Sequence, residues 1–337
     1  MAAPHINLII RDYRRKNIVK QKGVIKTKYE KGVEYTPTDD LCTRVKTCGH
    51  ITEVMTTEHK SKGGYTIKMD KETYLDTRTG ECKEFKHYAT RAQDLNSVSR
   101  SLAYGRDLLN TNITDPKFCR WMTLTYAENM TDPKRLKQDF ENFNRVCRKK
   151  YGHYEYITAA EPQERGAWHL HAVLIFDHLA PFMDNQTVAK MWGQGFITIK
   201  KLEDVDNVGA YLTAYLGDLE VPAEEDTEAA ERAGICKVVE TVDANGKPIK
   251  KKFIKGRRLI LYPPQFHIFR WSRGVKKPTV EYMTYKRAKE KVGAATPTFE
   301  KTVSMSDEET QYTNTLYYAY YNTARTSCQA DNDDLPL

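Results

Sequence analysis

The 337-residue chain lacks several features that would assign it to common classes of protein. Its seven cysteines are odd in number and widely scattered, and no CxxC pair occurs, so we expect reduced thiols rather than a disulfide framework. No apolar run approaches the length of a membrane-spanning helix, and the run from Ile6 to Ile10 is too short for a signal peptide. We therefore expect a cytoplasmic protein with no membrane partner.

The sequence also contains no GxxxxGK phosphate-binding loop and no internal repeat, so it has no evident helicase motor. Its apolar content of 40% and charged content of 29% are those of an ordinary globular protein. The net charge of +8 gives a mild preference for polyanions. Composition therefore leaves the function to be read from short motifs.

The stretch from Trp168 to Phe176 contains two histidines, His169 and His171, in an otherwise apolar sequence that predicts a buried strand. Side chains on a strand alternate between its two faces, so residues i and i+2 point the same way, roughly 6.6 Å apart along the backbone. Two imidazoles at this spacing can bind one divalent ion, and a core strand gains nothing from two polar rings unless something binds them. The pair therefore predicts a metal site.

A carboxylate is expected beside the two histidines. Residues 154–160 predict a second strand and 162–166 a tight turn, so that the two strands form a hairpin. Residues that flank the turn face each other across the ladder, which places Glu161 within reach of the same ion. Two imidazoles and one carboxylate leave coordination positions open, as catalytic sites do, and this mixed donor set suits Mn²⁺ or Mg²⁺. The alternative is that Glu161 is an ordinary surface carboxylate at a turn.

Two tyrosines supply a candidate nucleophile. Residues 205–216 have apolar side chains at helical spacing, and Tyr211 and Tyr215 lie four residues apart on one face of the predicted helix. A phenol has a pKa near 10 and attacks poorly at neutral pH unless a metal polarises the phosphodiester. The alternative is that both rings merely extend the packing face of the helix.

The order of the predicted elements indicates an α+β fold. We expect a central antiparallel sheet of about five strands flanked by helices, with the histidine strand in its centre. On an earlier strand, Thr123 and Thr125 share one face and could orient the metal cluster or the DNA, or simply reflect β propensity. The predicted elements are a helix at 92–109, a strand at 120–126, a helix from the Thr131-Asp132-Pro133 cap to Gly152, the hairpin, a strand at 196–200 and the helix at 205–216.

Basic residues with interleaved aromatic side chains follow this core. Lysines and arginines would neutralise phosphates, and Phe253, Phe269 and Trp271 could stack on unpaired bases, although a charge run is also what a solvated face shows. The candidates for DNA contact are Lys250, Lys252, Arg257, Arg258, Arg270, Arg273, Lys276 and Lys277.

Composition divides the chain into four parts. Residues 1–95 are polar and their role is not legible, and residues 96–220 form the predicted core. Residues 221–300 combine an acidic linker with a basic extension that has strand-like runs at 259–262 and 266–271, and residues 301–337 form an acidic tail in which we expect little order. Cys42, Cys48 and His50 could form part of a zinc knuckle, for which no fourth ligand is evident.

Three short motifs, taken in order, resemble those of the HUH endonucleases. They are Met122-Thr-Leu-Thr-Tyr126, Glu161 with His169-Leu170-His171, and Tyr211-x-x-x-Tyr215. The likeness is closest to the rolling-circle replication initiators of bacterial plasmids, phages and integrated elements, and it covers roughly residues 100–280. Trp-Gly-Gln-Gly-Phe and Ser-Arg-Gly-Val-Lys-Lys-Pro are similar to phrases of that family. Relatives often carry lysine three residues after the nucleophile, where this chain has Ala214.

The resemblance implies a ferredoxin- or RRM-like nuclease core and a specific reaction. Tyr211 would attack a phosphodiester of single-stranded or hairpin origin DNA, leaving a 5′-phosphotyrosine link and a 3′-OH that primes synthesis, and Tyr215 would perform a second transfer. Mn²⁺ or Mg²⁺ would assist, and a host helicase and DNA polymerase would be partners.

Three alternatives stay open on the sequence. The first is a relaxase or transposase with the same site. The second is a DNA-binding replication regulator with an inactive nuclease core. The third is a histidine-ligated zinc hydrolase, which would cleave without a protein–DNA link.

Overall fold

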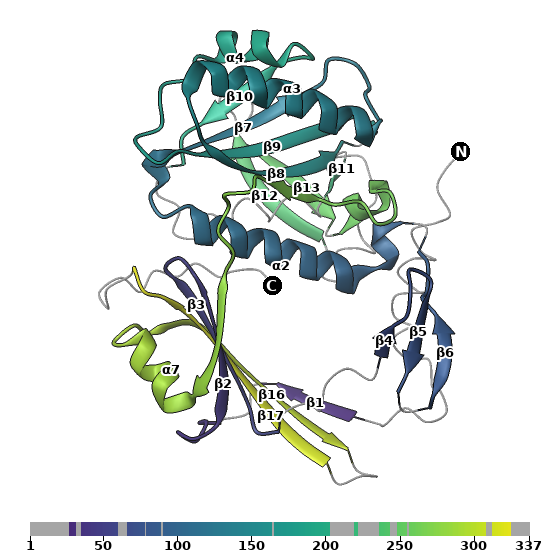
Figure 1. Cartoon of the computed structure of the whole chain (residues 1–337), viewed down its shortest axis with the longest axis vertical. Helices are drawn as coiled ribbons and strands as arrows, with labels where there is room; N and C mark the ends of the chain where they lie inside the picture. The colour runs from purple at the N-terminus through teal and green to yellow at the C-terminus, as the bar shows by residue number, and fades with distance from the viewer. Residues whose placement is uncertain are drawn as a thin grey trace.

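The structure is a computed structural model that describes residues 27–31, 35–59, 66–77, 79–88, 90–163, 165–202, 219–221, 236–242, 248–254, 256–307 and 312–324. The predicted helix at 205–216, with Tyr211 and Tyr215, lies outside the described residues. Figure 1 shows two large sheets on opposite sides of the long helix α2 (Leu95–Asn112).

A five-stranded antiparallel sheet carries the two histidines. Its strands lie in the order β10-β7-β9-β8-β14, so that the histidine strand β9 is central (Figure 1). The predicted α+β class with an antiparallel sheet of five strands is confirmed. The bounds are Cys119–Thr125 for β7, Glu155–Pro162 for β8, Trp168–Ile175 for β9, Ile197–Lys200 for β10 and Phe269–Trp271 for β14.

Helices α3 (Pro133–Tyr151) and α4 (Asn185–Trp192) cover one face of this sheet (Figure 1). The α3 helix begins where the sequence predicts, because the Asp132 side chain accepts a hydrogen bond from the Lys134 backbone N–H. It ends at Gly152, whose φ of 85° favours glycine.

The apolar side chains of α3 and α4 pack against alternate residues of the strands. In β7 these are Met122 and Leu124, which are 1% and 0% exposed. Since strand side chains alternate, Thr123 and Thr125 point to the opposite face. The core therefore fixes which face of the sheet carries the polar residues. The buried side chains of α3 are those of Leu136, Phe140, Phe143 and Cys147.

Helix α2 lies on the other side of this sheet, near its β14 edge (Figure 1). Gly105 makes this approach possible, because a Cβ there would lie only 2.4 Å from the ring of Phe269. Tyr104 of the same helix packs edge-on against Trp271, with ring centroids 5.6 Å apart. The α2 helix therefore covers part of the face that carries the polar residues.

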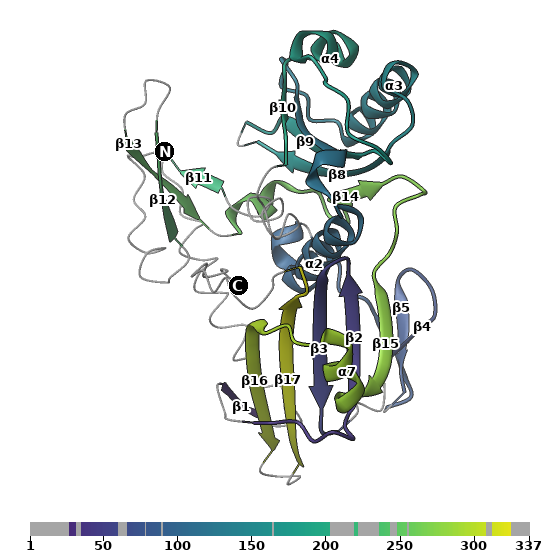
Figure 2. The same cartoon turned by 90° about the vertical axis from the view of Figure 1, so that its left-hand side faces the viewer.

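The second large sheet joins the two ends of the chain. Its six antiparallel strands lie in the order β1-β16-β17-β3-β2-β15, and Figure 2 shows them side by side, with helix α7 (Tyr285–Val292) against one face in Figure 1. The sequence predicts little order after residue 301, but 297–307 and 312–322 are long strands, because pairing with β3 and β1 supplies order that no local pattern reveals. The bounds are Thr27–Lys31 for β1, Cys42–Cys48 for β2, Ile51–Thr57 for β3, Thr279–Thr284 for β15, Pro297–Asp307 for β16 and Tyr312–Asn322 for β17.

Two small three-stranded sheets and three short 3-10 helices complete the described part of the chain. The strand expected at 259–262 is wrong: Arg257–Leu261 forms the 3-10 helix η3, which follows Gly256 in a left-handed conformation and precedes Pro263 and Pro264. The remaining elements are β4 (Thr66–Lys68), β5 (Thr73–Asp76), β6 (Glu81–Glu84), η1 (Arg91–Gln93), η2 (Pro116–Phe118), β11 (Leu219–Val221), β12 (Cys236–Val242) and β13 (Pro248–Ile254).

The cysteines in the described ranges are all free thiols. The zinc-knuckle alternative fails, because Cys42 and Cys48 mark opposite ends of β2, roughly 20 Å apart along an extended strand. None of the helices that the structure describes combines the length and apolar character that a membrane crossing needs.

Candidate functional site

The register of the central strands brings the predicted polar residues to one place. Glu161 of β8 is the direct cross-strand partner of His169, and Thr125 of β7 is its partner on the other side. His171 is flanked in the same way by Thr123 and Ala159. Directly opposed residues share a face, so both histidines, Glu161 and both threonines lie on the face that α3 and α4 leave uncovered.

His171 is held on both ring nitrogens. Its Nε2 hydrogen-bonds Oε2 of Glu161, and its Nδ1 lies 3.1 Å from Oγ1 of Thr123. Since an ionised carboxylate only accepts hydrogen bonds, we assign the proton to Nε2, and Nδ1 then accepts from the threonine hydroxyl. Thr123 therefore fixes the orientation of the His171 ring.

Arg258 completes the cluster from a distant part of the sequence. It lies in η3 and places its guanidinium 2.5 Å from Oε1 of Glu161, while the same nitrogen donates to the Pro162 carbonyl oxygen at 3.0 Å. Both charged side chains of this pair are nearly buried, at 12% and 11% exposed. Nearby, the Tyr262 hydroxyl donates to the Ala160 carbonyl oxygen and ties the end of η3 to β8.

Glu161 remains ionised in this environment. Burial raises the pKa of its carboxyl, but the hydrogen bond from His171 and the positive charge of Arg258 oppose burial and outweigh it. The pKa of Glu161 therefore lies below its ordinary value, and both carboxylate oxygens have partners.

His169 is the unsatisfied member of the cluster. Its Nε2 is buried and has no hydrogen-bond partner among the described residues. Burial lowers the pKa of His169 to about 4, and the charges of Arg258 and Arg165 act in the same direction. The ring is therefore neutral at pH 7, which is the state in which an imidazole binds a metal ion.

These donors fit a divalent metal in kind, but they are not arranged as a finished ligand set. Within the described ranges, no three His, Cys, Asp or Glu side chains stand ready to hold an ion. The two imidazole rings are 6.5 Å apart between centroids, and Nε2 of His171 faces Glu161. Binding would use the free Nε2 of His169 and would replace the hydrogen bond between His171 and Glu161.

The loop before β10 supports the neighbouring strand of the site. The Trp192 indole N–H donates to the Thr125 carbonyl oxygen at 2.9 Å. Gly195 lies against the same carbonyl, so closely that a Cβ there would be 2.3 Å from the oxygen. Gly193 ends α4 in a left-handed conformation with φ of 67°. The Trp-Gly-Gln-Gly stretch is therefore required by backbone geometry beside the histidine strand.

The predicted DNA-contacting residues are dispersed. Lys250 and Lys252 lie on β13 and Arg270 on β14, whereas Arg273, Lys276 and Lys277 lie in the exposed turn and loop that follow β14. Arg257 opens η3, and Arg258 belongs to the cluster with Glu161. Tyr211 and Tyr215 lie outside the described residues, so the predicted contact between a phenol and the cluster stays a prediction.

Sequence reasoning missed the role of Arg258 as the partner of Glu161. The basic run that contains it gives no signal that distinguishes it from its neighbours, since the contact depends on η3 returning to β8 from 96 residues further along the chain. Its separation from the hairpin hides it from any local pattern.

The part of the chain that carries the cluster matches a known family. Residues 119–220 match the model of a family described as replication-associated protein ORF2. This stretch is less than a third of the chain and contains Glu161, His169, His171 and both tyrosines. No curated protein and no solved structure matches the chain. The chain is thus similar over this stretch to replication-associated proteins, which supports a role as a replication initiator.

Proposed function

We propose that this protein starts rolling-circle replication by nicking single-stranded origin DNA and later rejoins the strand. The observation that carries the proposal is the cluster of His169, His171 and Glu161 on one face of the central strands, with an unpartnered imidazole nitrogen among the described residues. The family match over the same stretch supports a replication initiator that binds DNA. Such a protein would act in the cytoplasm of a bacterial host.

The proposed reaction is a transesterification. The Tyr211 hydroxyl attacks the phosphorus atom of a phosphodiester, the bond from phosphorus to the 3′ oxygen breaks, and the phenol proton is released as the 3′ oxygen gains one. The products are a 5′-phosphotyrosine link and a free 3′-OH, so the number of phosphoester bonds does not change. Tyr215 would attack a second phosphodiester in the transfer that releases the displaced strand.

A divalent ion, Mn²⁺ or Mg²⁺, would polarise the phosphodiester and stabilise charge in the transition state. His169, His171 and Glu161 would hold it, and Thr123 would keep the His171 ring in position. Arg258 would balance the charge of Glu161 within the cluster. A host helicase would have to unwind the duplex, since the sequence contains no phosphate-binding loop, and a host DNA polymerase would extend the 3′-OH.

The test is covalent capture from a pool of single-stranded DNA of randomised sequence, in the presence of Mn²⁺. With the label at the 3′ end, we expect a labelled protein band that survives denaturing electrophoresis, because the fragment on the 3′ side stays on the tyrosine. With the label at the 5′ end, the labelled fragment should leave. Tyr211→Phe should abolish the band while DNA binding persists.

The same experiment separates the alternatives. A DNA-binding regulator predicts retained DNA without a covalent band. A zinc hydrolase predicts cleavage that survives Tyr211→Phe combined with Tyr215→Phe. A relaxase or transposase predicts the same adduct, and sequencing of the captured strands would identify the target as a transfer origin or element end instead of a replication origin.

A further inference from the structure

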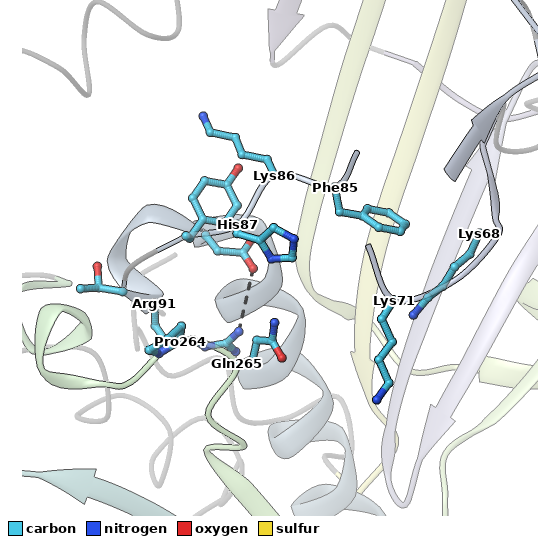
Figure 3. A pocket seen from close by; sticks show the side chains of 11 residues that line it. Lys68, Lys71, Phe85, Lys86, His87, Arg91, Pro264 and Gln265 are labelled. Carbon is cyan, nitrogen blue, oxygen red and sulfur yellow. Dashed lines mark ion pairs between the residues drawn. The ribbon is translucent and has the colours of Figure 1, made fainter. Parts of the chain in front are cut away.

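A second site lies beside the cluster, between the β4–β5–β6 sheet and the start of α2. It is a cavity of about 250 Å³, and Figure 3 shows side chains from three parts of the chain around it. Lys68 and Lys71 come from the region of β4, Lys86 from the segment after β6, and Pro264 and Gln265 from the loop after η3. A volume of several water molecules is enough for a phosphate group or a nucleobase.

The cavity carries an excess of positive charge. Lys68, Lys71 and Lys86 are exposed, and none of them forms an ion pair with a carboxylate in the part of the chain that the structure describes. The Asp94 carboxylate also lines the cavity, 3.9 Å from the guanidinium of Arg91. Four cationic side chains therefore face one carboxylate, a balance that favours an anionic ligand.

Arg91 gives this site a built element. It is 7% exposed, and its two terminal nitrogens donate to the hydroxyls of Ser97 and Ser101 on α2. Its Nε is buried and has no hydrogen-bond partner among the described residues. A buried guanidinium N–H without a partner is costly, and an anionic oxygen would satisfy it.

Aromatic rings accompany the charges. Phe85 and Tyr88 line the cavity, with the Lys68 ammonium 5.9 Å from the Phe85 ring centroid and the Lys86 ammonium 5.2 Å from that of Tyr88. His87 lines it as well and pairs with Glu72 on its outer side at 2.6 Å. Lysines that contact phosphates beside rings that stack on bases are the combination that binds unpaired nucleic acid.

One short segment links this cavity to the cluster on the five-stranded sheet. Arg258 contacts Glu161, Tyr262 binds the backbone of β8, and Gln265 lines the cavity. Seven residues separate Arg258 from Gln265, so their Cα atoms are at most about 25 Å apart. A strand with a phosphate spacing of about 3.4 Å covers that distance with roughly seven nucleotides.

We infer that this cavity binds the same single-stranded DNA as the cluster, a few nucleotides from the phosphodiester that is cut. The lysines and Arg91 take the phosphates, and Phe85 and Tyr88 stack on an unpaired base. This inference rests on the proposed function for the identity of the strand. The binding itself depends only on the cavity and can be tested alone.

The experiment measures binding of a fluorescein-labelled oligothymidylate of roughly 20 nucleotides, which spans the cavity and the cluster. Affinity is recorded by fluorescence anisotropy over a series of NaCl concentrations. For a single strand, the logarithm of affinity falls by about 0.7 per phosphate contact for each tenfold rise in salt, so changing Lys68, Lys71 and Lys86 to Ala should make this dependence shallower by about 2.

The matched control changes three exposed lysines on α3 and α4, Lys134, Lys149 and Lys190, to Ala. These helices cover the opposite face of the five-stranded sheet, and this variant should bind and respond to salt almost as the wild type does. Equal affinity and equal salt dependence in the two triple variants would overturn the inference. Inorganic phosphate added at constant ionic strength should not displace the strand, and displacement would show a site for free phosphate instead.

The aromatic residues provide a second arm. Tyr88→Leu should weaken binding about tenfold with the salt dependence unchanged, because stacking releases no counterions. Unchanged affinity would remove base stacking from the site. Cleavage by His169→Ala separates this inference from the proposed function. If that variant still cuts DNA, the proposed function fails, whereas the fate of the cavity is decided by the binding data.

Discussion

At the scale of single residues, the cluster divides into a satisfied part and an unsatisfied part. Glu161 has His171 on one oxygen and Arg258 on the other, and His171 also has Thr123. His169 sits next to them with a buried Nε2 that has no partner in the described chain. A buried polar atom without a partner costs stability, so His169 is the residue most readily explained by binding something.

His169→Ala should abolish nicking with little effect on folding. Loss of a ligand to the ion that stabilises the transition state should lower the cleavage rate by on the order of 10²–10³-fold or more. The free energy of unfolding should change by about 1 kcal/mol or less, since no hydrogen bond from Nε2 to the described residues is lost. Cleavage of captured single-stranded DNA and urea denaturation measure the two effects.

The matched control for this substitution is His153→Ala. His153 is exposed and pairs with Glu155 at 3.1 Å, away from the cluster, so its removal should leave the cleavage rate unchanged. A cleavage rate of His169→Ala equal to that of the His153 variant would remove His169 from the reaction.

Arg258→Met should destabilise the protein. It would leave the Glu161 carboxylate buried without its cationic partner, which costs about 3 kcal/mol of unfolding free energy. Arg165→Met is the comparison, because Arg165 is exposed and donates to the Tyr126 carbonyl oxygen, a hydrogen bond worth about 1 kcal/mol. Similar losses for the two variants in urea denaturation would show that the Arg258 pair carries no special weight.

The sequence predicts the sheet side of this cluster and misses the rest. Alternation along a strand places His169 and His171 on one face, and the tight turn places Glu161 opposite them, so these contacts follow from local rules. The contact with Arg258 depends on tertiary folding of η3, which no periodicity encodes. The two tyrosines lie outside the described residues, so their predicted roles stay predictions.

At the scale of elements, strands and helices with a strong pattern are predicted well. The α3 helix begins at its Asp132 cap and ends at Gly152, and the hairpin of β8 and β9 follows apolar runs interrupted by a turn. The 259–262 run failed because its apolar residues pack from a 3-10 helix, with Leu259 5% and Tyr262 1% exposed. Burial of a short apolar run does not by itself distinguish a strand from a helical turn.

A buried ion cluster joins the terminal sheet to α2. Lys46 of β2 lies 2.6 Å from Glu53 of β3 and 2.8 Å from Asp107 of α2. Lys46→Met would leave two nearly buried carboxylates without this cation and should lower the unfolding free energy by about 3 kcal/mol. Lys137→Met, which breaks an exposed pair with Glu141, should cost about 0.5 kcal/mol or less, and equal losses would contradict this account.

The same cluster gives stability a defined pH dependence. Burial raises the pKa of Glu53, but Lys46 and Arg44 outweigh burial and hold that pKa below its ordinary value of 4.5. The unfolded chain therefore binds more protons in this range, and the contribution of Glu53 is present above pH 4.5 and is lost as pH falls through the lower, folded pKa. Lys46→Met should weaken this acid dependence in denaturation curves recorded across that range.

At the scale of the whole molecule, the ends of the chain fold together. Strand β17 pairs with β3 along seven residues, from Leu316 opposite Thr57 to Asn322 opposite Ile51. The sequence treats these segments as an obscure beginning and a tail, because strand pairing across more than 250 residues leaves no local signal. The predicted division of the chain at residue 301 thus cuts through strand β16.

Substitution in β17 should therefore expose the amino-terminal strands. Ala319 is fully buried against Val54 and Val45, so Ala319→Asp would place a charge in this core. Hydrogen exchange should show lost protection in 42–57 as well as in 312–322. Thr313→Asp, at an exposed position of the same strand, should leave both regions protected, and protection retained in 42–57 of the Ala319 variant would contradict a shared sheet.

The central claim is that a tyrosine of this chain becomes covalently linked to DNA next to the histidine cluster. Mass spectrometry of a trapped protein–DNA adduct after trypsin and nuclease digestion tests it directly, since cleavage after Lys201 and Arg232 places both candidate tyrosines in one peptide, 202–232. We predict a nucleotide on Tyr211 in this peptide, formed with Mn²⁺ and absent from His169→Ala. Cleaved DNA without any adduct, or an adduct in a different peptide, would contradict the account.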